Sequence, residues 1–145
     1  MKLEHIAFNV ADPVAVAAWY GRHCGFRVVR PVPGPAPTHF LADADATILE
    51  IYCNPPERVP DYRALDPLQF HLALTSSDPQ ADARRLVSAG AVWVNETRLD
   101  DGSHLVMLRN PWGLALKLCK RAQELLGTQA AEPHPVGGSD DRLLP

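Results

Sequence analysis

The chain has 145 residues, of which 46% are hydrophobic and 21% are charged, and its formal net charge is −3. These proportions are ordinary for one globular domain or two small modules, and the lack of a basic excess argues against a nucleic-acid partner. Three cysteines are an odd number for a disulfide framework, and the chain shows neither a secretion signal nor 18 consecutive apolar residues. We therefore expect a cytoplasmic protein with reduced thiols and no membrane contact.

The first half of the chain predicts one helix among four strands. Asp12-Pro13 is typical of a helix start and Gly25 of a helix end, with Trp19 and Tyr20 on the apolar side between them. Short apolar runs indicate strands over 3–10, 26–30, 38–42 and 46–53. The order is therefore β-α-β-β-β.

The second half repeats this order. Asp78-Pro79 begins a helix that runs to about Ala89, and Asp101-Gly102 is a strong hairpin signal. Strands are expected over 68–76, 92–96, 103–109 and 114–120.

Composition divides the chain into four segments. The first module covers 1–53, a proline-rich linker covers 54–67, and the second module covers 68–120. A turn of helix is expected near Tyr62 in the linker, and a short helix over 121–126. The rest of segment 121–145 is rich in Gly, Pro, Gln, Asp and Ser, so we expect it to be mostly flexible, with His134 solvated.

Two strings of residues recur in register and indicate an internal duplication. The pattern His-aliphatic-Ala-apolar-x-x-x-Asp-Pro occurs at 5–13 and again at 71–79, an offset of 66. Leu-Glu-Ile-Tyr-Cys at 49–53 corresponds to Leu-Lys-Leu-Cys at 116–119, with an offset of 67 between Glu50 and Lys117. One module therefore occurs twice, and it places four residues at equivalent positions: His5, Glu50, His71 and Lys117.

Strand alternation predicts that these four residues lie on the face of the sheet opposite the helices. Alternate residues share a face, so the intervening apolar residues pack under the helices; these are Ile6, Phe8, Leu49, Ile51, Leu72, Leu74, Leu116 and Leu118. Small neighbours such as Ala7, Ala73 and Ala115 would leave room beside the polar groups, as a binding site requires.

The residue types suggest a metal site. Two imidazoles and a carboxylate, from His5, His71 and Glu50, form a common set of three ligands for a divalent metal with open positions, whether Fe, Mn, Ni, Co or Zn. Lys117 does not fit as a ligand while it is protonated, although in a dry pocket a lysine can act as a base. Two alternatives remain open: the histidines are satisfied core residues, and Glu50 and Lys117 form an ion pair between the modules.

The strings at 3–10, 49–51, 70–74 and 110–118 resemble the strand signatures of the vicinal oxygen chelate superfamily, which includes glyoxalase I, extradiol dioxygenases and bleomycin resistance proteins. The resemblance covers about residues 1–120. It implies an α+β fold in which two tandem βαβββ modules form a cupped, eight-stranded mixed sheet with helices on the outer face. It also implies a homodimer. Lys117 stands where the metal-dependent enzymes of that superfamily carry a glutamate.

Three functions are compatible with these residues. In the first, His5, Glu50 and His71 bind a divalent metal, and the protein is a lyase, isomerase or dioxygenase acting on a small oxygen-chelating substrate, with Glu50 and Lys117 as catalytic groups. In the second, a metal-free protein of the bleomycin-resistance kind sequesters a small molecule. In the third, a degenerate module serves subunit contacts. Candidate substrate-binding residues are Tyr52, Thr75 and His104, with His39 as a further pocket residue.

Overall fold

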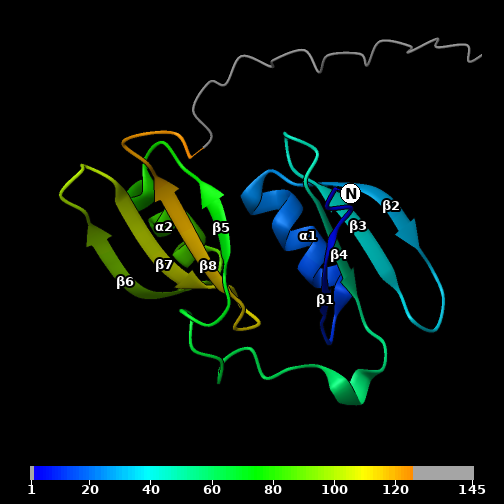
Figure 1. Ribbon diagram of the computed structural model, residues 1–145. Coiled ribbons are helices and arrows are strands. Elements are labelled where there is room, and N and C mark those ends of the chain that lie inside the picture. The colour runs from blue at the N-terminus through cyan, green and yellow to red at the C-terminus, as the bar shows by residue number, and fades with distance from the viewer. Residues whose placement is uncertain (1, 126–145) are drawn as a thin grey trace, which may run out of the picture.

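The computed structural model describes residues 2–125 and confirms an α+β fold of two βαβββ modules (Figure 1). The first module contains β1 (Ile6–Asn9), α1 (Pro13–Cys24), β2 (Arg27–Val32), β3 (Thr38–Ala42) and β4 (Ile48–Tyr52). The second contains β5 (Leu72–Thr75), α2 (Pro79–Ser88), β6 (Val92–Arg98), β7 (His104–Arg109) and β8 (Ala115–Lys120). A short 3-10 turn, η1 (Pro56–Arg58), lies in the linker.

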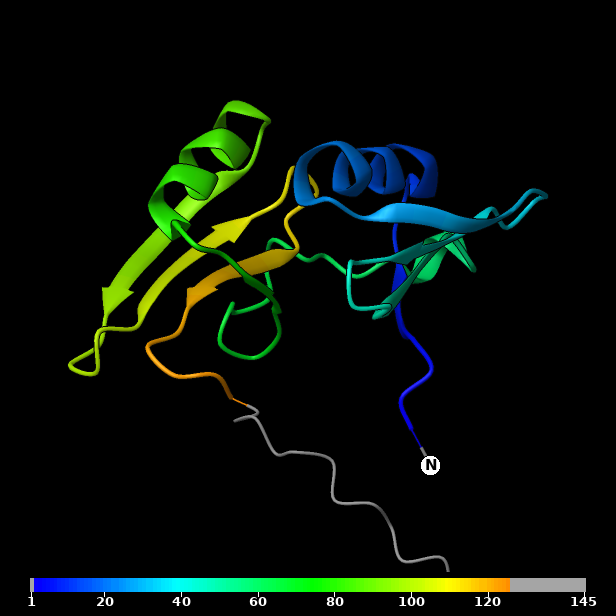
Figure 2. The same cartoon turned by 90° about the horizontal axis from the view of Figure 1, so that it is seen from above.

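Each module folds into its own four-stranded mixed sheet. The strand orders are β1-β4-β3-β2 and β5-β8-β7-β6, and only the first and last strands of each module pair in parallel. The eight strands therefore form two sheets, and within residues 2–125 no backbone ladder joins them. Figure 2 shows both helices on the same side of the two sheets, as the alternation of apolar residues requires.

The helices begin and end where the sequence predicts. The side chains of Asp12 and Asp78 accept hydrogen bonds from the backbone N–H groups of Ala15 and Ala81, at 2.9 and 3.0 Å, and a proline follows each cap. Such caps satisfy a donor that the first helical turn leaves free. Gly25 ends α1 in the left-handed conformation, with φ of 75°, a conformation that favours glycine.

The core lies between the helices and the sheets. Phe8, Leu49, Ile51, Leu116 and Leu118 are each no more than 3% exposed. Burial of side chains of this size stabilises a fold by about 1.5–3 kcal/mol each. The expected separation of an apolar face under the helices from a polar face opposite is therefore confirmed for these strands.

The two modules meet at the C-terminal half of α1. The indole Nε1 of Trp19 donates a hydrogen bond of 2.9 Å to the carbonyl oxygen of Ala89, just past the end of α2. The amide of Asn110 in the β7–β8 turn donates to the buried hydroxyl of Tyr20 at 3.3 Å. Arg85 of α2 donates to the carbonyl oxygen of His23 at 2.6 Å. Directional bonds between the modules thus fix their relative placement.

The linker crosses both modules and is bonded to each. The hydroxyl of Tyr62 donates to the carbonyl oxygen of Asn9 in the first module at 2.9 Å. From the second module, Arg109 donates to the carbonyl oxygens of Tyr62 and Leu65 at 2.8 and 2.6 Å. The linker is therefore an ordered part of the fold despite its prolines.

Two expected short helices are absent from the part of the chain that the structure describes. Near Tyr62 the chain instead forms a turn, in which the carboxylate of Asp61 accepts a hydrogen bond from the backbone N–H of Arg63 at 3.0 Å. Such local bonding competes with helix formation. Residues 121–125 contain no helix, and most of the extension expected to be flexible, including His134, lies outside the described residues. No helix within residues 2–125 is long and apolar enough to cross a membrane.

Replacing Trp19 by Phe should lower the free energy of unfolding by about 1–2 kcal/mol, because it removes the bond to Ala89 and part of a buried ring. Urea denaturation of the full chain measures the change. Trp19 is 8% exposed and Trp93 is 38% exposed, so Trp93→Phe is the matched control, with an expected change below about 0.5 kcal/mol. Equal effects of the two substitutions would contradict this account of the junction.

Candidate functional site

His5 and Glu50 lie together on the sheet face opposite the helices. Nε2 of His5 is 3.2 Å from Oε2 of Glu50, and Nδ1 of His5 is hydrogen-bonded to the carboxylate of Glu4. The ring of Phe40 lies edge-on to the imidazole, with 6.0 Å between centroids. The hydrogen bond to Glu4, opposed by partial burial and assisted by the charges of Glu4 and Glu50, raises the pKa of His5 above its ordinary value.

His71 lies at a different place. Its Nδ1 is 2.8 Å from the carbonyl oxygen of Pro67, and the ring of its neighbour Phe70 contacts Phe8, with 5.7 Å between centroids. His5 comes three residues before Phe8, which is roughly 10 Å along a strand. The residue that precedes His71 therefore lies beside Phe8 of β1.

Of the three expected metal ligands, the structure brings two together, His5 and Glu50. Zinc and similar ions need ligand atoms at about 2.0–2.3 Å, and only His5 and Glu50 are neighbours. Within residues 2–125, no three His, Cys, Asp or Glu side chains are grouped so that they could hold a metal ion. The ligand set of His5, Glu50 and His71 remains a sequence-based prediction.

Lys117 occupies the middle of β8, half-buried, in register with Ala73 on one side and Met107 on the other. Among the described residues no carboxylate lies within 4.0 Å of its amine, whereas Glu50 is paired with His5. The ion pair expected between Glu50 and Lys117 is therefore not formed. Glu50 is in register with Ala7 of β1 and Phe40 of β3, and His5 lies two residues before Ala7 on the same face of the sheet.

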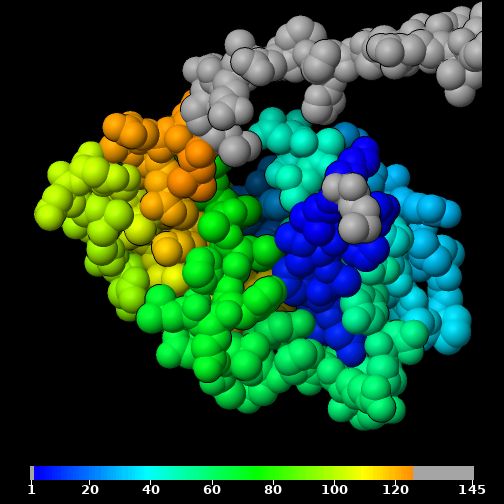
Figure 3. All heavy atoms as spheres, viewed as in Figure 1, coloured from blue at the N-terminus to red at the C-terminus, as the bar shows by residue number. Residues whose placement is uncertain are grey.

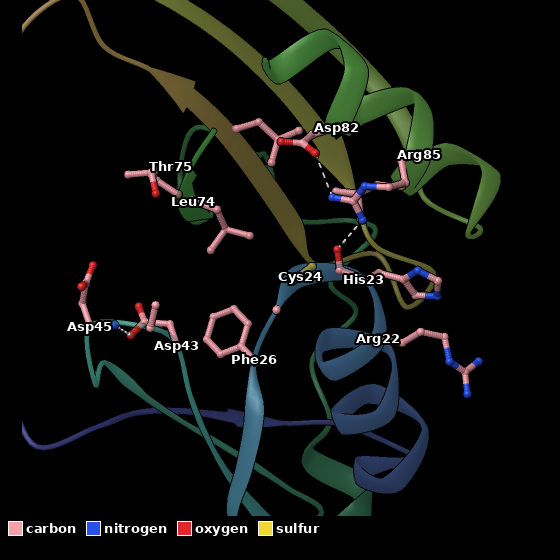
Figure 4. A pocket seen from close by; sticks show the side chains of 15 residues that line it. Arg22, His23, Cys24, Phe26, Asp43, Asp45, Leu74, Thr75, Asp82 and Arg85 are labelled. Atoms are coloured by element: carbon pink, nitrogen blue, oxygen red, sulfur yellow. Dashed lines mark hydrogen bonds and ion pairs between the residues drawn. The ribbon is translucent and has the colours of Figure 1, made fainter. Parts of the chain in front are cut away.

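A cavity of about 610 Å³, here called the intermodule cleft, opens between the two modules (Figure 3). One wall comes from the first module: the end of α1, Phe26 and the β3–β4 turn at 43–45. The other wall comes from β5 and α2, including Leu74 and Thr75. Figure 4 shows Phe26 and Leu74 facing each other across the space. Each wall of the cleft therefore contributes some apolar surface.

Polar groups line the rim of the intermodule cleft. Arg85 donates to Asp82 at 2.9 Å, and the hydroxyl of Ser76 donates to the same carboxylate at 2.6 Å. The Ser76 hydrogen bond and the Arg85 bond and charge together hold the pKa of Asp82 below its ordinary value, against the opposing effect of burial. On the opposite rim the carboxylate of Asp43 closes its own turn by accepting from the backbone N–H groups of Asp45 and Thr47, at 2.9 and 2.8 Å.

The thiol that lines the cleft is not a nucleophile at neutral pH. Burial, opposed by the charge of Arg85, raises the pKa of Cys24 to about 12. Because the thiolate is the reactive form, Cys24 contributes a small apolar surface to the cleft. All three cysteines of the chain are free.

The expected substrate-binding residues are dispersed. Thr75 lines the intermodule cleft. Tyr52 is part-buried at the end of β4. His39 shares a face with the buried Ile51, and its Nδ1 is buried without a hydrogen-bond partner. His104 is buried on the α2 side and lines a different cavity from Thr75, and its role in substrate binding stays a prediction.

Sequence reasoning missed most of the residues that line the cleft, among them Cys24, Phe26 and Arg85. They lie near the ends of helices and strands of both modules, where no motif marks them. The available signal was Gly25, which ends α1 and begins the segment that forms one wall.

Comparison with known proteins identifies related folds. Residues 5–119 match the glyoxalase-like domain. A glyoxalase family protein from Bacillus cereus is similar in structure, with a TM-score of 0.70 and 15% identity, covering 82% of this chain and 93% of that chain. Glyoxalase I from Zea mays has a TM-score of 0.66 and 19% identity, covering 82% of this chain and 44% of that chain.

An antibiotic-binding protein, TnmS3 from Streptomyces sp. CB03234, is also similar, with a TM-score of 0.61 and 23% identity, covering 81% of this chain and 96% of that chain. No curated protein matches the chain. Because each of these structures is less than 25% identical to this chain, the similarity shows a shared fold and nothing more.

The substitution Glu4→Gln should lower the pKa of His5, and Glu50→Gln should lower it less, because the hydrogen bond that Glu4 accepts from the His5 ring is the largest cause of the shift. NMR titration of the imidazole signals measures both. A raised pKa in the folded state means that the associated stabilisation is present below the ordinary pKa and is lost as the pH rises through the folded value. The control is Glu57→Gln in the linker, which should leave the pKa of His5 unchanged. An unchanged His5 titration in both variants would contradict the described cluster.

Proposed function

Because the chain belongs to the glyoxalase-like domain family, a fold that hosts several chemistries, we propose that it binds a small organic molecule in the intermodule cleft. The observation that carries this proposal is the cleft itself. Its volume of about 610 Å³ is within the range of about 300–1,000 Å³ found for ligand sites. It also lies between two modules, a common position for such sites.

The lining favours a ligand with an apolar body and a few hydrogen-bonding groups. Phe26 and Leu74 offer apolar surface on opposite walls, and the hydroxyl of Thr75 lies at the rim. Asp82 and Arg85 neutralise each other, and Arg22 extends away from the other labelled side chains in Figure 4. Asp43 and Asp45 add negative charge to the opposite wall, so a neutral or cationic ligand fits the cleft better than an anionic one.

The similar structures leave both an enzyme and a binding protein open. One is glyoxalase I and another is an antibiotic-binding protein. Glu50 and Lys117 do not line the cleft, although Ala73, the register neighbour of Lys117, does. The catalytic roles expected for Glu50 and Lys117 therefore remain predictions, and binding is the part of the function that the cleft supports.

A library of small aromatic compounds, screened against the isotope-labelled full chain by NMR, should contain members that bind saturably and shift the amide signals of Phe26, Leu74 and Thr75. The substitution Thr75→Trp should abolish these shifts by filling the cleft. Thr97→Trp, at an exposed position of β6 outside the cleft, should leave them unchanged. Compounds that bind elsewhere, or equally well to both variants, would exclude the cleft as the site.

A second candidate is the metal-dependent reaction suggested by the sequence. The observation in its favour is that His5 and Glu50, two of the three expected ligands, lie 3.2 Å apart. His71 does not form a group of three with them within residues 2–125. The geometry therefore supports ligand binding in the cleft more directly than a metal centre.

Metal content separates the two candidates. Protein purified without an affinity tag should hold much less than one equivalent of Fe, Mn, Ni, Co or Zn by plasma mass spectrometry, and should take up little when the ions are added. The comparison is the double variant His5→Ala/His71→Ala, which should behave in the same way. Near one equivalent in the native chain, lost in the double variant, would establish the metal centre instead.

A homodimer remains a proposal, and the outer strands support it. All residues of β2 and β6 are exposed, including Val28 and Val29 in β2 and Val92 and Trp93 in β6. The outer edges of these strands have unpaired backbone groups, and exposed apolar edges tend to pair with another chain. These edges are where we propose that a second copy pairs.

A further inference from the structure

The junction between the two modules is built twice from equivalent residues. The side chain of Trp19 donates a hydrogen bond to the carbonyl oxygen of Ala89, and the side chain of Arg85 donates one to the carbonyl oxygen of His23. At the offset of 66 that relates the two helix caps, Trp19 is the counterpart of Arg85, and His23 is the counterpart of Ala89. The junction therefore has two equivalent sides.

Each side also contains the turn between the last two strands of one module. In the second module, Oδ1 of Asn110 closes this turn by accepting from the backbone N–H groups two and four residues later, at 3.0 Å each. In the first module Asp43 takes the same position, at the offset of 67, and Oδ1 accepts from the corresponding N–H groups at 2.9 and 2.8 Å. A neutral amide suffices for this turn, so the turn does not require the negative charge of Asp43.

An aromatic side chain occupies one side of the junction, and a cavity occupies the other. The ring of Trp112 lies edge-on to Trp19, with 6.4 Å between centroids, and packs against the core. On the other side Asp45 is the counterpart of Trp112 and Arg85 is the counterpart of Trp19, and both line the intermodule cleft. The cleft therefore lies at the place that corresponds to the indole of Trp112.

The charges that line the cleft leave two carboxylates without a basic partner. Arg85 is paired with Asp82 at 2.9 Å, and Arg22 extends away from the other labelled side chains (Figure 4). Asp43 is half-buried and Asp45 is exposed, and within residues 2–125 no basic side chain lies within 4.0 Å of either carboxylate. Both turn bonds of Asp43 go to Oδ1, so its Oδ2 has no donor among the described residues. The wall that the first module contributes is therefore negatively charged.

We propose that the ligand of the intermodule cleft is an aromatic cation, in which a protonated amine is attached to an aromatic body. The aromatic body takes the place that corresponds to the ring of Trp112, between Phe26 and Leu74. The ammonium group donates to the carboxylates of Asp43 and Asp45. Aromatic rings bury a large apolar area, and hydrogen bonds between charged groups are stronger than neutral ones. This inference rests on the ligand binding proposed above for the same cleft.

Three probes that share a phenyl body test the proposal. At neutral pH phenethylamine is a cation, phenethyl alcohol is neutral and phenylacetate is an anion. Each is titrated at constant ionic strength into the isotope-labelled full chain, and the amide signals of Phe26, Leu74 and Thr75 are followed by NMR. Phenethylamine should bind saturably and at least about fivefold more tightly than phenethyl alcohol, because of its charged hydrogen bonds. Phenylacetate should bind most weakly.

The double variant Asp43→Asn/Asp45→Asn removes the charge and keeps the turn, since an amide closes the equivalent turn at Asn110. It should weaken the binding of phenethylamine about fivefold and leave that of phenethyl alcohol unchanged. The matched control is Glu57→Gln/Asp100→Asn, which removes the same charge from exposed positions outside the cleft. The control should bind all three probes as the native chain does.

The substitution Asp45→Trp tests the place of the aromatic body, because it provides on the open side the side chain that Trp112 provides on the other. Binding of both phenethylamine and phenethyl alcohol should be lost, whereas Asp100→Trp, outside the cleft, should leave it unchanged. Binding that survives Asp45→Trp would overturn the inference. Equal binding of the amine and the alcohol in the cleft would overturn the preference for a cation and leave the proposed ligand binding intact. Absence of saturable shifts with every probe would overturn both.

Discussion

The placement of the modules depends on the contact that the C-terminal half of α1 makes with the second module. Trp19, Tyr20 and the carbonyl oxygen of His23 each take part in a hydrogen bond that crosses the junction. These bonds are directional, so they fix an orientation where apolar contact alone would allow sliding. The intermodule cleft lies beside this junction, and its lining includes Cys24 and Gly25 at the end of α1 and Arg85 of α2. A change at the junction is therefore a change in the shape of the candidate site.

Much of the fold followed from the sequence because its signals are local. The caps Asp12 and Asp78, the glycine at 25 and the alternation of apolar residues each depend on neighbours a few positions away. The duplication then extended these signals to both modules. The segment near Tyr62 forms a turn and not the predicted helix. The hydrogen bond that the Asp61 carboxylate accepts from the backbone N–H of Arg63 stabilises that turn, and no sequence motif marks such a bond.

The candidate site was less predictable, since it depends on how the modules face each other. The repeat predicts that His5 and His71 lie at equivalent positions of their modules. It does not predict how the two modules are oriented, and therefore not whether the two side chains meet. In the structure Phe70, which precedes His71, lies against Phe8 of β1. His5 and Glu50 were placed together because they lie on adjacent strands of one module.

The linker limits how two copies of this chain can combine. Tyr62 is bonded to Asn9 of the first module through its hydroxyl and to Arg109 of the second through its carbonyl oxygen. If two chains exchanged modules, each linker would have to break one of these bonds and rebuild it with the other chain. Pairing through the outer edges of β2 and β6 leaves every such bond within its own chain. Because Asn9 accepts through its backbone carbonyl oxygen, the side chains that hold the linker to its own two modules are those of Tyr62 and Arg109.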